Sequence, residues 1–84
     1  MVEEFFVKEL RIKAESFEDI RSISELAASE TFRVIVSDGL RTVNAKSLMS
    51  IFSLKFGRPL VLQLDCSDSE YESFRQKAAR FLAN

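Results

Sequence analysis

The sequence predicts an α+β domain with the element order βαββαβα. Two observations lead to this prediction. Four short segments alternate between apolar and polar residues, which is typical of strands with one solvated face. Three other segments carry apolar residues at helical spacing. The 84 residues of the chain fit a single domain, residues 1–84, with no repeat or linker.

The first strand and the first helix are predicted from residues 8–29. Residues 8–14 alternate and place Leu10, Ile12 and Ala14 on one side of a strand. Ser16 is followed by acidic residues at 18 and 19, a pattern typical of a helix N-cap. The helix is expected to end near residue 29. Its predicted core stripe consists of Phe17, Ile20, Ile23 and Ala27.

The middle of the chain predicts a hairpin followed by a short helix. Residues 32–36 alternate, and Asp38 and Gly39, a dipeptide typical of tight turns, then lead into a second strand over residues 40–44. A short helix is then predicted over residues 47–54. Gly57 and Pro59 end helical structure shortly afterwards.

The last strand and helix are predicted from residues 60–82. Cys66 shares a strand face with Leu60, Leu62 and Leu64, so we expect a buried thiol with no chemical role. Two segments, Ser67 to Glu70 and Ser69 to Glu72, both have the pattern of a capping box. The final helical stripe consists of Tyr71, Phe74, Ala78, Phe81 and Leu82.

Composition excludes several classes of function. Twelve basic and thirteen acidic residues give a net charge of −1, which argues against a nucleic-acid partner. The chain has no histidine, so histidine catalysis and histidine metal ligands are impossible. The acidic residues Asp65, Asp68, Glu70 and Glu72 are interpreted as helix caps, not as a metal site. We therefore expect no catalytic residues, no metal and no cofactor.

Cellular location is inferred from what the sequence lacks. The charged start of the chain is unlike a signal peptide, and no apolar run approaches the roughly 20 residues of a membrane span. A single cysteine cannot form an internal disulfide. We expect a cytoplasmic protein that does not interact with membranes.

The predicted helix 47–54 is apolar over more of its circumference than packing on a sheet requires. Leu48, Met49, Phe52 and Phe56 lie within one arc, and Ile51 and Leu54 lie on the other side. One side should pack on the sheet, so we expect Met49 and Phe52 to be more exposed than Ile51 and Leu54. The exposed side is interpreted as a partner surface; the alternative is a helix embedded on both sides.

Residues 43–54, VNAKSLMSIFSL, resemble the segment around the regulatory serine of HPr, the phosphocarrier of the bacterial sugar phosphotransferase system. The resemblance implies an open-faced sandwich in which a four-stranded antiparallel sheet of order 1-4-2-3 has helices on one face. It also implies that Ser47 is the serine that HPr kinase/phosphorylase modifies; the sequence alone favours plain helix capping as the role of Ser47. Leu48, Met49 and Phe52 then form the apolar patch that the family offers to phosphotransferase components and to a catabolite control regulator, with Lys46 beside it.

The phosphocarrier loop of the family is missing. Where the family has Gly-x-His-x-Arg-Pro, residues 15–22 of this chain read ESFEDIRS, without histidine or proline. Two carboxylates, Glu18 and Asp19, would repel a phosphoryl group at this helix start. The chain is thus similar to catabolite-repression HPr homologues, and we expect a non-catalytic regulatory protein switched by phosphorylation of Ser47.

Two alternatives remain open at this stage. A ferredoxin-like domain of the ACT type, which binds small molecules, has a similar element order but a sheet of order 4-1-3-2. A phosphocarrier that uses another residue would require an acyl phosphate on Glu18 or Asp19. Strand order discriminates the first alternative from the HPr-like arrangement.

Overall fold

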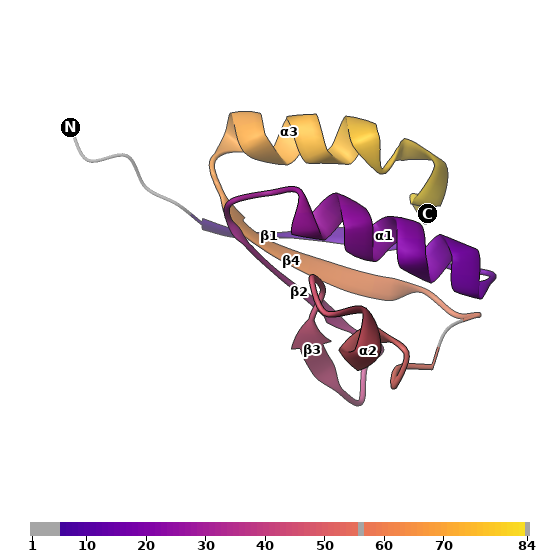
Figure 1. Ribbon diagram of the computed structural model, residues 1–84. Coiled ribbons are helices and arrows are strands. Elements are labelled where there is room, and N and C mark those ends of the chain that lie inside the picture. The colour runs from indigo at the N-terminus through magenta and orange to yellow at the C-terminus, as the bar shows by residue number, and fades with distance from the viewer. Residues whose placement is uncertain (1–5, 56, 84) are drawn as a thin grey trace.

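A computed structural model describes residues 6–55 and 57–83 as one sheet covered by helices. Within these residues the element order is βαββαβα, as predicted, followed by a short 3₁₀ helix (Figure 1). The elements are β1 (Phe6–Ile12), α1 (Phe17–Ala28), β2 (Arg33–Ser37), β3 (Thr42–Asn44), α2 (Leu48–Ile51), β4 (Leu60–Cys66), α3 (Asp68–Lys77) and the 3₁₀ helix Ala79–Phe81.

The four strands form an antiparallel sheet of order β1-β4-β2-β3. Leu62 of β4 lies opposite Leu10 of β1 on one side and opposite Val36 of β2 on the other. The predicted order 1-4-2-3 is therefore confirmed. The ferredoxin-like order 4-1-3-2, which would place β1 beside β3, is not the order of this sheet.

The core lies between one face of the sheet and the helices. Figure 1 shows α1 and α3 lying together over this face, with α2 beside β3. Side chains of alternate strand residues point into the layer between sheet and helices, as the pleat of a strand requires. The fully buried large side chains are Phe74, Ile12, Ile20, Ile51, Leu60, Leu62, Leu64, Val34, Val36 and Cys66.

Helix α1 begins as predicted, but its first residue does not join the core. Ser16 is the N-cap, and the backbone N–H of Asp19 donates to its Oγ at 3.1 Å. Ile20, Ile23 and Ala27 are buried, whereas 63% of Phe17 is exposed. The prediction that Phe17 belongs to the core was wrong. At 100° per residue, Phe17 lies about 70° from the centre of the buried stripe that Ile20, Ile23, Ser24 and Ala27 form, on the same side as Arg21.

Strand β3 and helix α2 are shorter than predicted. Residues 40 and 41 belong to the turn, because the N–H groups of Leu40 and Arg41 both donate to Oδ1 of Asp38, each at 2.8 Å. Gly39 accommodates this turn with φ +95°, a region that L-residues rarely adopt. The strand therefore starts at Thr42, two residues later than predicted. Helix α2 ends at Ile51 with Phe52 as its C-cap, although Leu54 is still buried in the core.

The C-terminal part of the chain follows the prediction, and the structure shows which of the two predicted capping boxes begins α3. Ser67, not Ser69, is the N-cap of α3: its Oγ accepts from the N–H of Glu70, whose carboxylate accepts from the N–H of Ser67. Helix α3 ends at Lys77, and the 3₁₀ helix carries Phe81 back to the core. Tyr71 and Leu82 are only half-buried at the edge of the core. Within the described part of the chain, none of the helices combines the length and the apolar character that crossing a membrane requires.

Candidate functional site

Apolar side chains from α1 and α2 gather on one exposed surface, which we call the α1–α2 patch: Phe17, Leu48, Met49 and Phe52. Met49 is 83% exposed and Phe52 is 41% exposed, whereas Ile51 is 1% and Leu54 is 4% exposed. The prediction that the two pairs face opposite ways is confirmed. Leu48 is half-buried and packs against the core, so it forms the base of the patch.

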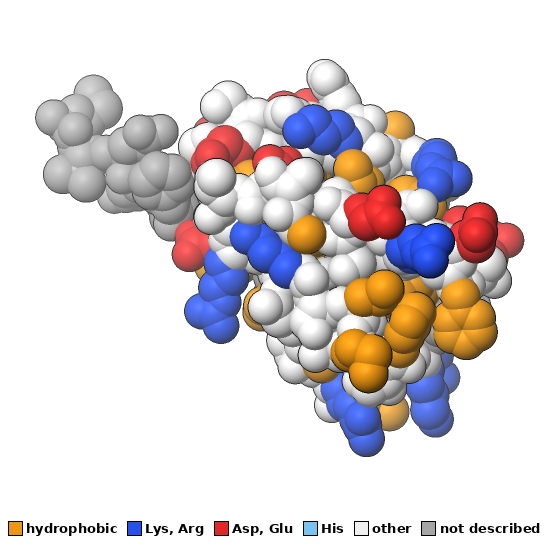
Figure 2. Space-filling model, viewed as in Figure 1, with side chains coloured by type: hydrophobic (Ala, Val, Ile, Leu, Met, Phe, Trp, Pro, Cys, Tyr) orange, Lys and Arg blue, Asp and Glu red, His pale blue; other side chains and the backbone are white. Residues whose placement is uncertain are grey.

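The patch is continuous between the two helices. The rings of Phe17 and Phe52 meet edge to face, with their centroids 5.5 Å apart and an interplanar angle of 85°. Figure 2 shows apolar side chains clustered over α2 and the adjoining end of α1, with charged groups around them. A hollow of about 230 Å³ lies here, lined by Phe17, Leu48 and Phe52 together with Glu18 and Arg21. The arrangement presents an apolar surface with one acidic and one basic group at its rim.

Ser47 is the N-cap of α2, directly beside the patch. The N–H of Ser50 donates to its Oγ at 3.4 Å, a length at the outer limit of a hydrogen bond, and its side chain is half-exposed. Helix α2 has only four residues, so its dipole is small and contributes little to holding an added phosphate. The hydroxyl is thus weakly held and accessible in part, which suits modification as well as capping.

Lys46 makes a contact that the sequence does not predict. Its ammonium donates to the backbone carbonyl oxygen of Glu30 at 2.8 Å, just beyond the end of α1. Its backbone N–H donates to Oδ1 of Asn44 at 2.9 Å. Lys46 therefore ties the segment before α2 to the end of α1, whereas Phe17 joins the patch from the start of α1.

Two residues of this surface were not among those predicted for it. Phe17 was assigned to the core, and Arg21 was given no role. The signal that identifies both is their spacing of four residues, which places them on the same side of α1, beside the buried stripe. Phe56, which was predicted to share the arc of Met49 and Phe52, lies outside the described residues.

The remaining candidate groups have structural roles. Cys66 is 1% exposed, and burial raises the pKa of its thiol, which keeps the thiol protonated and unreactive. In the predicted acidic cluster, Glu70 completes the capping box and Asp68 lies 3.3 Å from the ammonium of Lys8. Among residues 6–55 and 57–83, no three His, Cys, Asp or Glu side chains are grouped so that they could hold a metal ion.

In comparisons with protein-family models, curated proteins and solved structures, no significant match to this chain is found. The α1–α2 patch offers exposed apolar area beside the half-exposed Ser47.

Proposed function

We propose that this chain is a non-catalytic regulatory module that binds a protein partner through the α1–α2 patch and is switched by phosphorylation of Ser47. The observation that carries the proposal is the exposure of Met49 and Phe52 beside buried Ile51 and Leu54. Large apolar side chains clustered on a surface mark an interaction site more often than chance placement does. Met and aromatic residues are also enriched at the centres of protein interfaces.

The identity of the partner rests on the resemblance of residues 43–54 to HPr. The sheet order β1-β4-β2-β3 supports this reading, because it is the order that the resemblance leads us to expect. The proposed partners are HPr kinase/phosphorylase, components of the sugar phosphotransferase system and a catabolite control regulator. These are cytoplasmic bacterial proteins, so we place the module in the same compartment. It would contribute to control of sugar transport.

The proposed mechanism is a change of surface charge without a change of fold. Phosphorylation adds about −1.5 to −2 charges at Ser47, immediately before Leu48 and Met49. A partner that covers the unmodified patch with acidic groups would be repelled. A partner that presents Arg or Lys beside its apolar surface would be recruited, because charge-assisted hydrogen bonds to phosphate are strong.

Phosphocarrier activity is not part of the proposal. Glu18 and Asp19 both lie in the first turn of α1, and Asp19 Oδ2 accepts from the N–H of Glu15 at 3.0 Å. The two carboxylates at this helix start would repel a phosphoryl group. The acyl-phosphate alternative is tested by incubation with phosphoenolpyruvate and enzyme I: we expect no mass gain of one phosphoryl group.

The small-molecule alternative loses its main support. The ACT-type hypothesis depended on a ferredoxin-like sheet, and this sheet has a different order. The hollow between Phe17 and Phe52 measures only about 230 Å³, which is below the roughly 300 to 1,000 Å³ typical of small-molecule sites.

The test is phosphorylation by HPr kinase/phosphorylase with ATP, read by intact mass and peptide mapping. We expect one phosphoryl group on wild type and on Ser53→Ala, but none on Ser47→Ala. Ser53 is a matched control, because it is exposed and lies on the same segment. Label on Ser50 or Ser53, or none on wild type, would overturn the assignment of Ser47.

A second experiment tests whether phosphorylation changes partner binding. Calorimetry with the catabolite control regulator should detect the phosphorylated protein and not the unmodified one, and Met49→Ala should weaken that binding. Equal affinity of both forms would show that Ser47 is no switch, even if the patch binds.

A further inference from the structure

A second surface feature lies on the far side of β2 from β4, away from the α1–α2 patch. Pairing of β2 with β3 ends at Ile35 and Asn44, although β2 begins two residues earlier, at Arg33. Beyond this pair, the N–H of Ala45 still donates to the carbonyl of Val34 at 3.0 Å. The chain then turns toward α2, and a hollow of about 470 Å³ lies between β2, β3 and the segment that leads to α2. We call it the β2–β3 hollow. Its volume is within the range of small-molecule sites.

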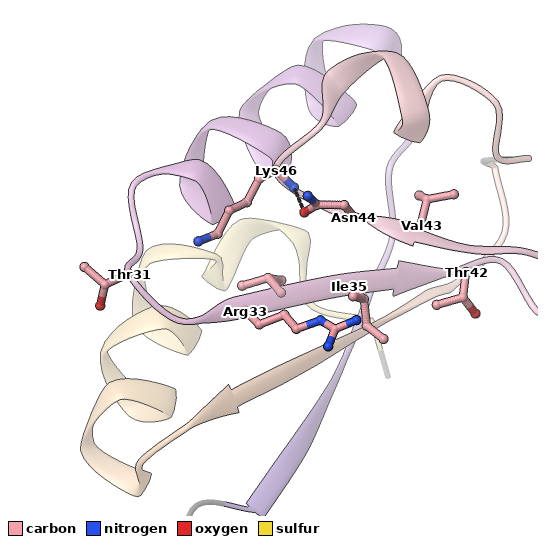
Figure 3. Close-up of a pocket in the computed structure, with 8 residues that line it drawn as sticks. Thr31, Arg33, Ile35, Thr42, Val43, Asn44 and Lys46 are labelled. Carbon is pink, nitrogen blue, oxygen red and sulfur yellow. Dashed lines mark hydrogen bonds between the residues drawn. The ribbon is translucent and has the colours of Figure 1, made fainter.

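The side chains around this hollow are complementary to an anion. Its polar lining consists of Thr31, Arg33, Thr42, Asn44 and Lys46, and no Asp or Glu is among the residues that line it. In Figure 3, Asn44 and Lys46 lie on one side and Arg33 on the other, with Thr31 and Thr42 at the two ends. The residues that line this hollow thus include two cations, two hydroxyls and an amide.

Two acidic residues lie near the cations of the hollow. Asp65 lies opposite Arg33 in the register of β2 and β4 and lines a neighbouring hollow with it, but no ion pair joins them among the described residues. The carboxylate of Glu30 lies 3.7 Å from the ammonium of Lys77, so only the backbone carbonyl of Glu30 contacts Lys46. The ammonium of Lys46 has three N–H groups and gives one to that carbonyl. Two remain for a ligand.

We propose that the β2–β3 hollow binds a small oxyanion, a phosphoryl or carboxylate compound, between Arg33 and Lys46. The planar guanidinium of Arg33 suits bidentate contact with either group. Thr31 and Thr42 can donate hydroxyl hydrogens, and Asn44 can donate from its amide. This site is independent of the patch and of the modification of Ser47, so either proposal can fail without the other.

The experiment is a titration of ¹⁵N-labelled protein at low ionic strength, followed by amide chemical shifts. Inorganic phosphate and citrate are added in separate series, with sodium chloride at matched ionic strength as the control. We expect saturable shifts at Thr31, Arg33, Thr42 and Lys46 in the millimolar range or below. Saturation by phosphate alone identifies a phosphoryl ligand, and saturation by citrate alone identifies a carboxylate ligand.

Substitutions distinguish a site from general attraction of anions. Arg33→Gln should weaken binding about tenfold, because it removes a charge-assisted contact. Arg58→Gln is the matched control: Arg58 is exposed and lies outside the hollow, so binding should not change. If Arg33→Gln does not fold, Lys46→Gln removes the other cation and gives the same reading.

Three outcomes would overturn the proposal. The first is that chloride causes the same shifts, the second is that the shifts spread over basic residues in general, and the third is that Arg33→Gln and Arg58→Gln weaken binding equally. Each would mean that the anions screen surface charge without occupying the hollow.

Discussion

Asp38 is the residue that holds the β2–β3 turn to the segment after α2. Its Oδ1 accepts from the N–H groups of Leu40 and Arg41, and its Oδ2 accepts from the N–H of Lys55 at 3.0 Å. These bonds, above all the one from Lys55, lower the pKa of the carboxyl from 3.8 to about 2. Because Lys55 follows α2, the carboxylate helps to fix the C-terminal side of the helix that carries Met49 and ends at Phe52.

We predict that Asp38→Asn lowers Tm by several degrees at neutral pH, because an amide has one oxygen where the turn uses two. The folded pKa is depressed, so the stabilisation is present above the unfolded value of 3.8 and is lost as pH falls toward about 2. The Tm difference between wild type and variant should therefore shrink over that interval. Thermal unfolding followed by circular dichroism measures it, with exposed Asp65→Asn as the control. A difference that stays constant in acid would contradict this role for the carboxylate.

Ser47 contributes little to stability in its unmodified form, since its capping bond is 3.4 Å long. We predict that Ser47→Asp changes the free energy of unfolding by less than about 1 kcal/mol, because Asp is as good an N-cap as Ser. Tm should then move by only a few degrees. If Ser47→Asp unfolds the domain while Ser47→Ala does not, negative charge is incompatible with this position and the switch must act through the fold.

At the scale of elements, sequence periodicity predicts which elements exist better than where they end. The strand 60–66 was predicted with its observed bounds because four residues of one parity are apolar. The start of β3 depends on local bonds, because Asp38 holds the N–H groups of Leu40 and Arg41 in the turn. The end of α2 depends on the packing of Leu54 and on the bond from Lys55 to Asp38, which joins segments far apart in sequence. The patch was predicted in part: the arc of α2 indicates Met49 and Phe52, but only the approach of α1 brings Phe17 to them.

The two sides of α2 should differ in what they contribute to stability. We predict that Ile51→Ala costs about 2 to 5 kcal/mol, because its side chain is 1% exposed and truncation leaves a cavity. Met49→Ala should cost no more than about 0.5 kcal/mol. Phe52→Ala should fall between them, at up to about 1.5 kcal/mol, since its ring contacts Phe17. Urea unfolding at equilibrium measures all three; similar losses at Ile51 and Met49 would mean that the helix is embedded on both sides.

For the whole molecule, the two edges of the sheet differ in whether other parts of the chain cover them. At the β3 edge, the early end of strand pairing leaves the β2–β3 hollow open. At the β1 edge, Tyr71 Oη donates to the carbonyl of Glu9, and the C-terminal residues pair with the end of the strand. The N–H of Lys13 donates to the carbonyl of Phe81 at 2.7 Å, and the N–H of Ala83 donates to the carbonyl of Arg11 at 3.0 Å. This closure protects an edge that could otherwise pair with another chain.

Phe81 anchors this closure, because its side chain is 4% exposed and lies in the core. We predict that Phe81→Ala costs about 3 to 5 kcal/mol, a large part of the roughly 5 to 15 kcal/mol that stabilises a typical domain. Arg80→Ala is the matched control: Arg80 is exposed, its guanidinium lies 4.2 Å from the Phe81 ring centroid, and it should cost no more than about 1 kcal/mol. Hydrogen exchange gives a second reading, since the amides of Lys13 and Ala83 should exchange faster in Phe81→Ala than in Arg80→Ala. Equal stability and equal exchange in the two variants would mean that the closed β1 edge does not depend on the anchoring of Phe81 in the core.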